Sequence, residues 1–160
     1  MSTKISIILG FIISVIMLSL ASVIMSKIRS VDSFINTLYG DRLYRSALFI
    51  IILSSISIIY CIVSFIRLMN LQEDSDDVNP KSMLYNIGVI SLIIMIFSSD
   101  MMYSINNSSE FGSLSDGSVV KNIVISIISI SVIALVGCIG GYYYISKNTP
   151  IPRVSAYIKY

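Results

Sequence analysis

The sequence predicts an all-α integral membrane protein with four transmembrane helices, in which the first two helices form an extended hairpin. Four stretches without a charged residue support this fold class, and they hold 22, 21, 18 and 25 residues. A helix rises about 1.5 Å per residue, so these stretches match the roughly 30 Å hydrocarbon core of a bilayer. Charged residues make up 12% of the chain, about half of the share that is usual in soluble domains.

The predicted spans cover approximately residues 5–26, 46–66, 82–103 and 120–145, in a single domain of residues 1–160. Three connections and a tail leave no room for a separate soluble domain. The first stretch is too long for the apolar core of an ordinary signal peptide, and no clean cleavage site follows it. We therefore expect the first stretch to be a retained helix.

The first helix is expected to continue beyond the membrane after Lys27. Apolar residues recur there at spacings of three and four, as on one face of a helix. Gly40 is a typical stop signal, so this helix should end at about Tyr39, and Asp41 should cap the second helix. The result would be a tight hairpin that stands off the membrane, and the alternative is a segment lying flat among the headgroups. The apolar stripe consists of Ile28, Val31, Ile35 and Leu38.

The second helix is predicted to end near Leu71, just before a cluster of acidic residues. Asn is favoured as an N-cap and Pro at the first helical position, so the third helix should begin at Asn79 and Pro80. The cluster lacks the ligand spacing and the later Glu of a calcium-binding EF-hand loop. We interpret it as a solvated loop or as a docking face for a basic partner. Its members are Glu73, Asp74, Asp76 and Asp77.

The third connection lies between two charged residues, Asp100 and Lys121. Both must lie at the same membrane face, and we expect them to form an interfacial ion pair or to be solvated separately at the interface, with a proton or ion pathway as the less favoured interpretation. The connection itself, about residues 104–118, is rich in Ser, Asn and Gly and should be mobile. It contains two overlapping N-x-S sequons, at Asn106 and Asn107, which would matter only on a glycosylating side of the membrane.

The fourth helix contains a GxxxG motif formed by Gly137 and Gly141, and Ser129 continues the strip of small residues. Small residues allow helices to approach closely in lipid. We expect the motif to pack within the four-helix unit; packing against another subunit, or no special role, are the alternatives. Three consecutive tyrosines then indicate the membrane interface. The tail, residues 146–160, contains two prolines and is predicted to be extended.

The residues that usually carry catalysis are absent or scattered. The chain has no His, which removes the commonest general base and the commonest metal ligand. Cys61 and Cys138 lie inside apolar stretches and are interpreted as small hydrophobic residues. The carboxylates all lie in loops or at helix ends. We therefore predict no catalytic, cofactor or metal site, and the protein is not expected to be an enzyme.

The expected function is that of a non-catalytic structural or assembly protein in a larger membrane-bound complex. A virion membrane or sub-capsid protein of a large DNA virus, in an internal virion membrane, fits the composition, and so does an accessory subunit of an organellar complex. The expected partners are the lipid bilayer and other protein subunits; nucleic acid and a small-molecule substrate are not expected, since the net charge is only +2. Besides the acidic cluster, the residues expected to contact partners are Tyr39, Arg42, Arg45, Arg153, Tyr157 and Tyr160.

The alternative function is that of a small oligomeric channel or transporter subunit. Serines in the helices could form a polar seam, but in the sequence they stand isolated rather than in a continuous polar stripe. Orientation stays open, because the positive charges divide six against five between the two sides. The density of positive charge in the first connection and the position of the sequons favour opposite orientations.

Overall fold

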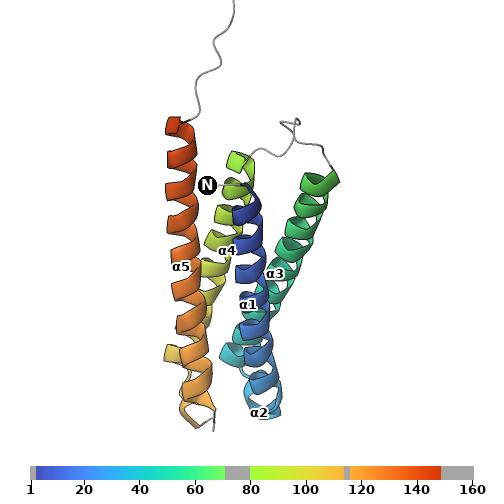
Figure 1. Ribbon diagram of the computed structural model, residues 1–160. Helices are drawn as coiled ribbons and strands as arrows, with labels where there is room; N and C mark the ends of the chain where they lie inside the picture. Colours follow the sequence, from blue (N-terminus) through green and yellow to red (C-terminus); the bar gives the residue numbers. More distant parts are fainter. Residues whose placement is uncertain (1–2, 71–79, 114–115, 149–160) are drawn as a thin grey trace, which may run out of the picture.

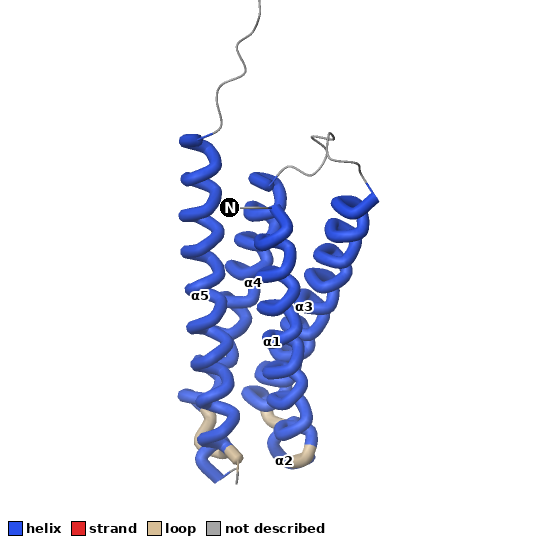
Figure 2. The backbone as a smooth tube through the Cα atoms, in the orientation of Figure 1, coloured by secondary structure: helices blue, strands red, loops and turns tan. Residues whose placement is uncertain are grey.

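The computed structural model describes residues 3–70, 80–113 and 116–148. Within these residues the chain forms four long helices, a single short helical turn and one 3₁₀ turn (Figure 1, Figure 2). All four long helices are long and apolar enough to cross a membrane, which confirms the prediction of a multi-pass integral membrane protein. The elements are α1 (Thr3–Arg29), α2 (Asp32–Ile35), α3 (Leu38–Asn70), α4 (Pro80–Asn107), η1 (Phe111–Ser113) and α5 (Gly117–Asn148).

The long helices run alternately up and down, so that the start of α1 and the end of α5 lie at the same end of the bundle (Figure 1). We call this end the terminal end, and the opposite end, which carries α2 and η1, the α2 end. The most extensive packing is between α4 and α5 and between α1 and α3, and α3 also packs against α4. Toward the terminal end, α3 and α5 spread apart (Figure 2).

Inward-facing residues recur at alternating spacings of three and four along every long helix. This heptad pattern is the one that packs helices in left-handed bundles. The outer faces are rich in isoleucine, and Ile133, for example, is 70% exposed. A bundle whose outside is this apolar is suited to lipid. In α1 the buried positions of the pattern are Ile7, Gly10, Ser14, Met17, Ala21, Ile24 and Ile28.

Serine is the characteristic residue of the core. Small side chains let the helices approach one another in lipid, and serine hydroxyls tolerate burial because they can donate to a carbonyl of the preceding turn. Ser98 and Ser131 form such bonds, and the hydroxyls of Ser14 and Ser57 form a hydrogen bond of 2.7 Å between α1 and α3. The buried serines are Ser6, Ser14, Ser46, Ser54, Ser57, Ser64, Ser91, Ser98, Ser104 and Ser131.

The prediction that the first helix continues to Tyr39 was wrong. Helix α1 ends at Arg29, Val31 adopts a non-helical conformation with φ −124° and ψ 82°, and the chain turns through α2 into α3. The prediction made from the apolar stripe failed because the turn buries Phe34 and leaves Leu38 79% exposed. The helices α1 and α3 still form an antiparallel hairpin, but α2 joins them.

The predicted cap of the second helix was also wrong. Thr37 caps α3, since its hydroxyl oxygen accepts a hydrogen bond from the Gly40 N–H at 3.0 Å, and its O–H donates one to the Phe34 carbonyl. Asp41 lies inside the first turn, where a carboxylate suits the helix dipole. Gly40 is not a stop signal but a point of close approach, because a Cβ there would collide with the Phe34 carbonyl.

The start of the third long helix agrees with the prediction, because α4 begins at Pro80. Helix α4 extends to Asn107, about one turn beyond the predicted end, and both sequon asparagines are exposed in its last turn. Helix α5 ends at Asn148, so the first residues assigned to the extended tail are helical. The expected N-cap Asn79 and the rest of the tail lie outside the described residues.

Candidate functional site

A polar cluster surrounds Asp100 at the α2 end of the described bundle. One carboxylate oxygen, Oδ1, forms a salt bridge with Arg42 Nη2 at 2.5 Å, and Oδ2 accepts a hydrogen bond of 3.0 Å from the Ser46 hydroxyl. The guanidinium of Arg42 also lies 5.4 Å from the ring centroid of Tyr103, which is within the range of a cation–π contact. The cluster therefore links α3 to α4, because Asp100 contacts two residues of α3 and Arg42 contacts two residues of α4.

This arrangement corrects the prediction that Asp100 pairs with Lys121. Lys121 is exposed on α5, whereas Asp100 lies beside the contact between α3 and α4. The prediction considered only the two charges that flank one connection. Because α3 begins at Leu38, several residues before the predicted span, it places Arg42 opposite Asp100.

Two further ion pairs lie at the same end. Lys27 Nζ and Asp116 Oδ2 are 2.8 Å apart and connect the end of α1 to the start of α5. Arg45 and Asp41 form a pair one turn apart within α3, at 2.7 Å. All four side chains are more than 40% exposed, so each pair contributes about 1 kcal/mol or less to stability. The main effect of the pair between Lys27 and Asp116 is to hold the end of α1 beside the start of α5.

An aromatic contact closes the α2 end between the two connections. The rings of Phe34 in α2 and Phe111 in η1 meet edge to face, with centroids 6.0 Å apart and an interplanar angle of 60°. Both side chains are buried and belong to the larger core cluster of the bundle. Aromatic pairs with this geometry stabilise a protein by about 0.5–1.5 kcal/mol beyond the effect of the area that they bury. Phe34 lies between α1 and α3, and Phe111 lies between α4 and α5, so this one contact stabilises the conformation of both connections.

These contacts change the interpretation of the predicted partner surface. Arg42 and Arg45 both form internal ion pairs, although their side chains remain 50% and 69% exposed. Tyr39 is half-buried in the first turn of α3. The described tip of the hairpin therefore stabilises the bundle, and only its exposed side is free for a partner. The remaining predicted contacts lie outside the described residues; they are Glu73, Asp74, Asp76, Asp77, Arg153, Tyr157 and Tyr160.

The GxxxG motif of α5 does not act as one contact. A Cβ added to Gly141 would lie 3.2 Å from Leu84 Cδ1, so this glycine packs against α4. Gly137 has no atom within 4 Å of such a Cβ, and Ser129 is exposed and bonds back to its own helix. The prediction of packing within the unit therefore holds for Gly141, whereas Gly137 and Ser129 lie outside the α4 contact.

Metal-binding side chains do not gather in the parts of the chain that the structure describes. The described residues contain no group of three or more His, Cys, Asp or Glu side chains that could hold a metal ion. Cys61 and Cys138 are buried free thiols on α3 and α5. No family model matches this chain, and no curated protein or solved structure matches it either.

Proposed function

We propose that this protein is a non-catalytic structural or assembly subunit of a larger membrane-bound complex and acts by binding other membrane proteins. The observation that supports this proposal is an outward face of α5. Gly137 and Gly140 have open space where side chains would stand, and exposed Ile133 and Val136 lie beside them. A glycine costs about 1 kcal/mol relative to alanine inside a helix, and in a membrane it permits a second helix to approach closely.

The chemistry of the bundle supports a binding role in preference to catalysis. A catalytic site needs a nucleophile, a base or acid and a stabilising group around one reacting atom. In the described residues the carboxylates of Asp41, Asp100 and Asp116 each face a cation in an ion pair. These pairs lie near the ends of the helices and connect or reinforce them, which is a structural role.

The buried serines are the feature that would favour the alternative, a channel or transporter. Several of their hydroxyls donate to carbonyls of their own helix, as Ser14, Ser98 and Ser131 do. Bulky residues such as Met17 and Ile94 are buried in the same core. We therefore attribute the serines to close helix packing rather than to a conduction path. A virion membrane of a large DNA virus and an organellar complex are the two settings that fit the composition.

The test is recovery of partners from the native membrane. The full chain is cross-linked there and purified by affinity, and the bound proteins are identified by mass spectrometry. A variant with Leu at both Gly137 and Gly140 should lose specific partners, because the side chains occupy the space that a second helix would use. The control Val132→Phe adds bulk at another exposed position of α5 and should retain them.

The stability of each variant must also be measured, because a loss of partners is informative only if the four-helix bundle is still folded. Both glycines lack a neighbour within 4 Å of an added Cβ, and leucine favours a helix more than glycine does, so the double variant should unfold at the same detergent concentration as the parent or at a higher one. Equal recovery of partners in both variants would contradict the proposal. Ion conduction by the purified protein alone in liposomes would favour the channel alternative.

A further inference from the structure

The bundle consists of two helical hairpins that pack more tightly within themselves than against each other. The first hairpin contains α1 and α3, and the second contains α4 and α5. These two pairs form the most extensive helix contacts, whereas α1 packs far less against α4 and α5 (Figure 1). The two hairpins therefore meet mainly along α3 and α4.

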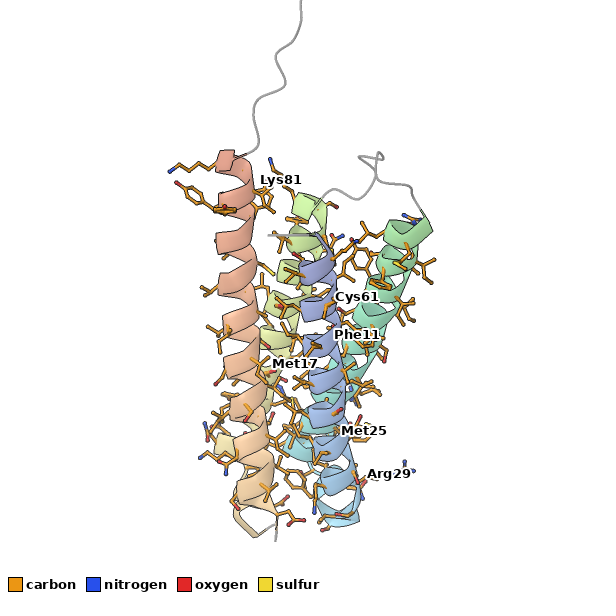
Figure 3. All side chains as sticks on the ribbon, in the orientation of Figure 1. Phe11, Met17, Met25, Arg29, Cys61 and Lys81 are labelled. Atoms are coloured by element: carbon orange, nitrogen blue, oxygen red, sulfur yellow. The ribbon has the colours of Figure 1, made fainter. Side chains whose placement is uncertain are left out.

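Small residues hold each hairpin together in the half of the bundle that leads to the terminal end. In the first hairpin, a Cβ added to Gly10 would lie 3.3 Å from the Sγ of Cys61, so α1 and α3 approach closely (Figure 3). In the second hairpin, a Cβ on Gly88 would lie 3.5 Å from the Cβ of Cys138. Each hairpin is therefore closely packed in this half as well as at the α2 end.

Specific contacts between the two hairpins are concentrated in the half of the described bundle that leads to the α2 end. They include an edge-to-face aromatic pair, two salt bridges and a stack of two rings with centroids 4.9 Å apart. Helices in lipid have no hydrophobic driving force toward one another, so polar contacts and close packing hold them together. The contacts are Phe34–Phe111, Lys27–Asp116, Arg42–Asp100 and Phe49–Phe97.

A hydrogen bond inside the membrane joins the hairpins in the other half. The amide N–H of Asn86 in α4 donates to the hydroxyl of Tyr60 in α3 at 3.1 Å. Tyr60 lies seven residues before Arg67, and Asn86 lies five residues after Lys81, so both polar groups lie about 8–10 Å from the charged ends of their spans. At this depth lipid offers no replacement partner for either group.

We propose that the bundle opens as a hinge, in which the hairpins stay joined at the α2 end and separate at the terminal end, with the bond between Tyr60 and Asn86 as the latch. The core cluster of the terminal end is the smaller of the two, so separation costs less there than at the α2 end. Acyl chains replace the lost apolar contacts without a hydrophobic penalty. The hinge does not depend on the proposed function, because it involves no partner on the outer face of α5.

Distances between pairs of spin labels, measured on the full chain in lipid nanodiscs, test the hinge. The labels are attached to an unnatural amino acid, so that both native cysteines stay in place. Ile66 and Ile139 report on the distance between α3 and α5 at the terminal end, and Leu48 and Ile125 report on it at the α2 end; all four positions are exposed. The terminal pair should show a second, longer distance, and the α2 pair should show a single distance.

Two tyrosine variants identify the latch. Tyr60→Phe removes the hydroxyl and keeps the ring, and it should raise the ratio of open to closed molecules about threefold, which corresponds to about 0.6 kcal/mol for a hydrogen bond between membrane helices. Tyr85→Phe removes an exposed hydroxyl from α4 and should leave the ratio unchanged. A third label pair, Ile5 and Ile66, lies within the first hairpin and should keep one distance in every variant.

Three results would overturn the hinge. The first is a single distance for the terminal pair in both the parent and Tyr60→Phe. The second is an unchanged ratio of open to closed molecules in Tyr60→Phe, which would show that the hydrogen bond is not the latch. The third is a second distance for the α2 pair or for the pair within the first hairpin, because the hairpins would then not move as bodies about the α2 end. A single, unchanged distance for the α2 pair also shows that Tyr60→Phe is folded.

Discussion

Replacing Gly141 by leucine should destabilise the bundle, whereas the same change at Gly137 should not. The two positions lie one turn apart in α5 and differ mainly in their surroundings. A Cβ at Gly141 would lie 3.2 Å from Leu84 Cδ1 and 3.6 Å from Cδ2, while a Cβ at Gly137 would have no neighbour within 4 Å. Comparing the two variants therefore separates the effect of packing inside the bundle from the general effect of replacing glycine by leucine.

The size of the difference follows from the contact. Leu84 is 5% exposed and belongs to the smaller core cluster at the terminal end, so a leucine at position 141 would have to displace a packed side chain. Overpacking a filled core costs typically 1–3 kcal/mol. Both substitutions gain about the same helix propensity, up to about 1 kcal/mol, which cancels in the comparison. The free energy of unfolding should thus be about 1–3 kcal/mol lower for Gly141→Leu than for Gly137→Leu.

Unfolding in mixed micelles, with an increasing fraction of denaturing detergent and helicity or gel mobility as the signal, measures this difference. Val132→Phe, at an exposed position of α5, controls for added bulk on the lipid-facing surface. If both glycine variants unfold at the same detergent fraction, Gly141 is not a packing contact and the assignment of the α4–α5 interface is wrong. Greater destabilisation by Gly137→Leu would mean that α5 is rotated about its axis relative to the structure.

Two further pairs of variants test the polar contacts by the same unfolding assay. Asp100→Asn should lower the free energy of unfolding by about 1 kcal/mol, because it weakens the salt bridge to the half-exposed Arg42. Lys121→Gln should leave the free energy of unfolding unchanged. The reverse result would restore the pairing of Asp100 with Lys121 that the sequence predicts. Ser57→Ala should cost about 0.6 kcal/mol, the average for a hydrogen bond between membrane helices. Ser54→Ala should cost nothing or stabilise the bundle, because the buried Ser54 hydroxyl has no hydrogen-bond partner in the structure; a loss equal to that of Ser57→Ala would show that Ser54 has one.

The number and position of the long helices could be predicted from the sequence because each depends on local properties. A run of about twenty residues without charge has one stable form in lipid, which is a helix. The start of α4 at Pro80 was predictable for a similar reason, since proline suits the first helical position. No knowledge of neighbouring helices is needed for either conclusion.

The turn between α1 and α3 could not be predicted in this way, because a distant contact decides it. An apolar stripe over residues 28–38 suits a continuous helix as well as a turn. The turn is stabilised because Phe34 packs on Phe111, which lies far along the sequence, in the connection between α4 and α5. The partner of Asp100 is a similar case, since Arg42 faces it only through the register of α3 against α4.

The burial of the serines could be predicted from the sequence only in part. Ser57 and Ser64, and likewise Ser91 and Ser98, are spaced by seven residues, which is the period of an inward-facing position in a bundle. Seen one helix at a time, however, such serines look like isolated polar residues. Only the alignment of all four helices places them in one core and forms the bond between Ser14 and Ser57.

The two ends of the bundle differ in a way that bears on the proposed function. At the α2 end, an aromatic contact and ion pairs connect all four helices or their connections. At the terminal end, the core cluster is smaller and includes two cysteines, and apolar grooves lie between α4 and α5 and between α1 and α3. Stability should therefore depend mainly on residues at the α2 end. Under the proposed function, a partner helix that packs beside Gly137 and Gly140 would leave the contacts at the α2 end undisturbed.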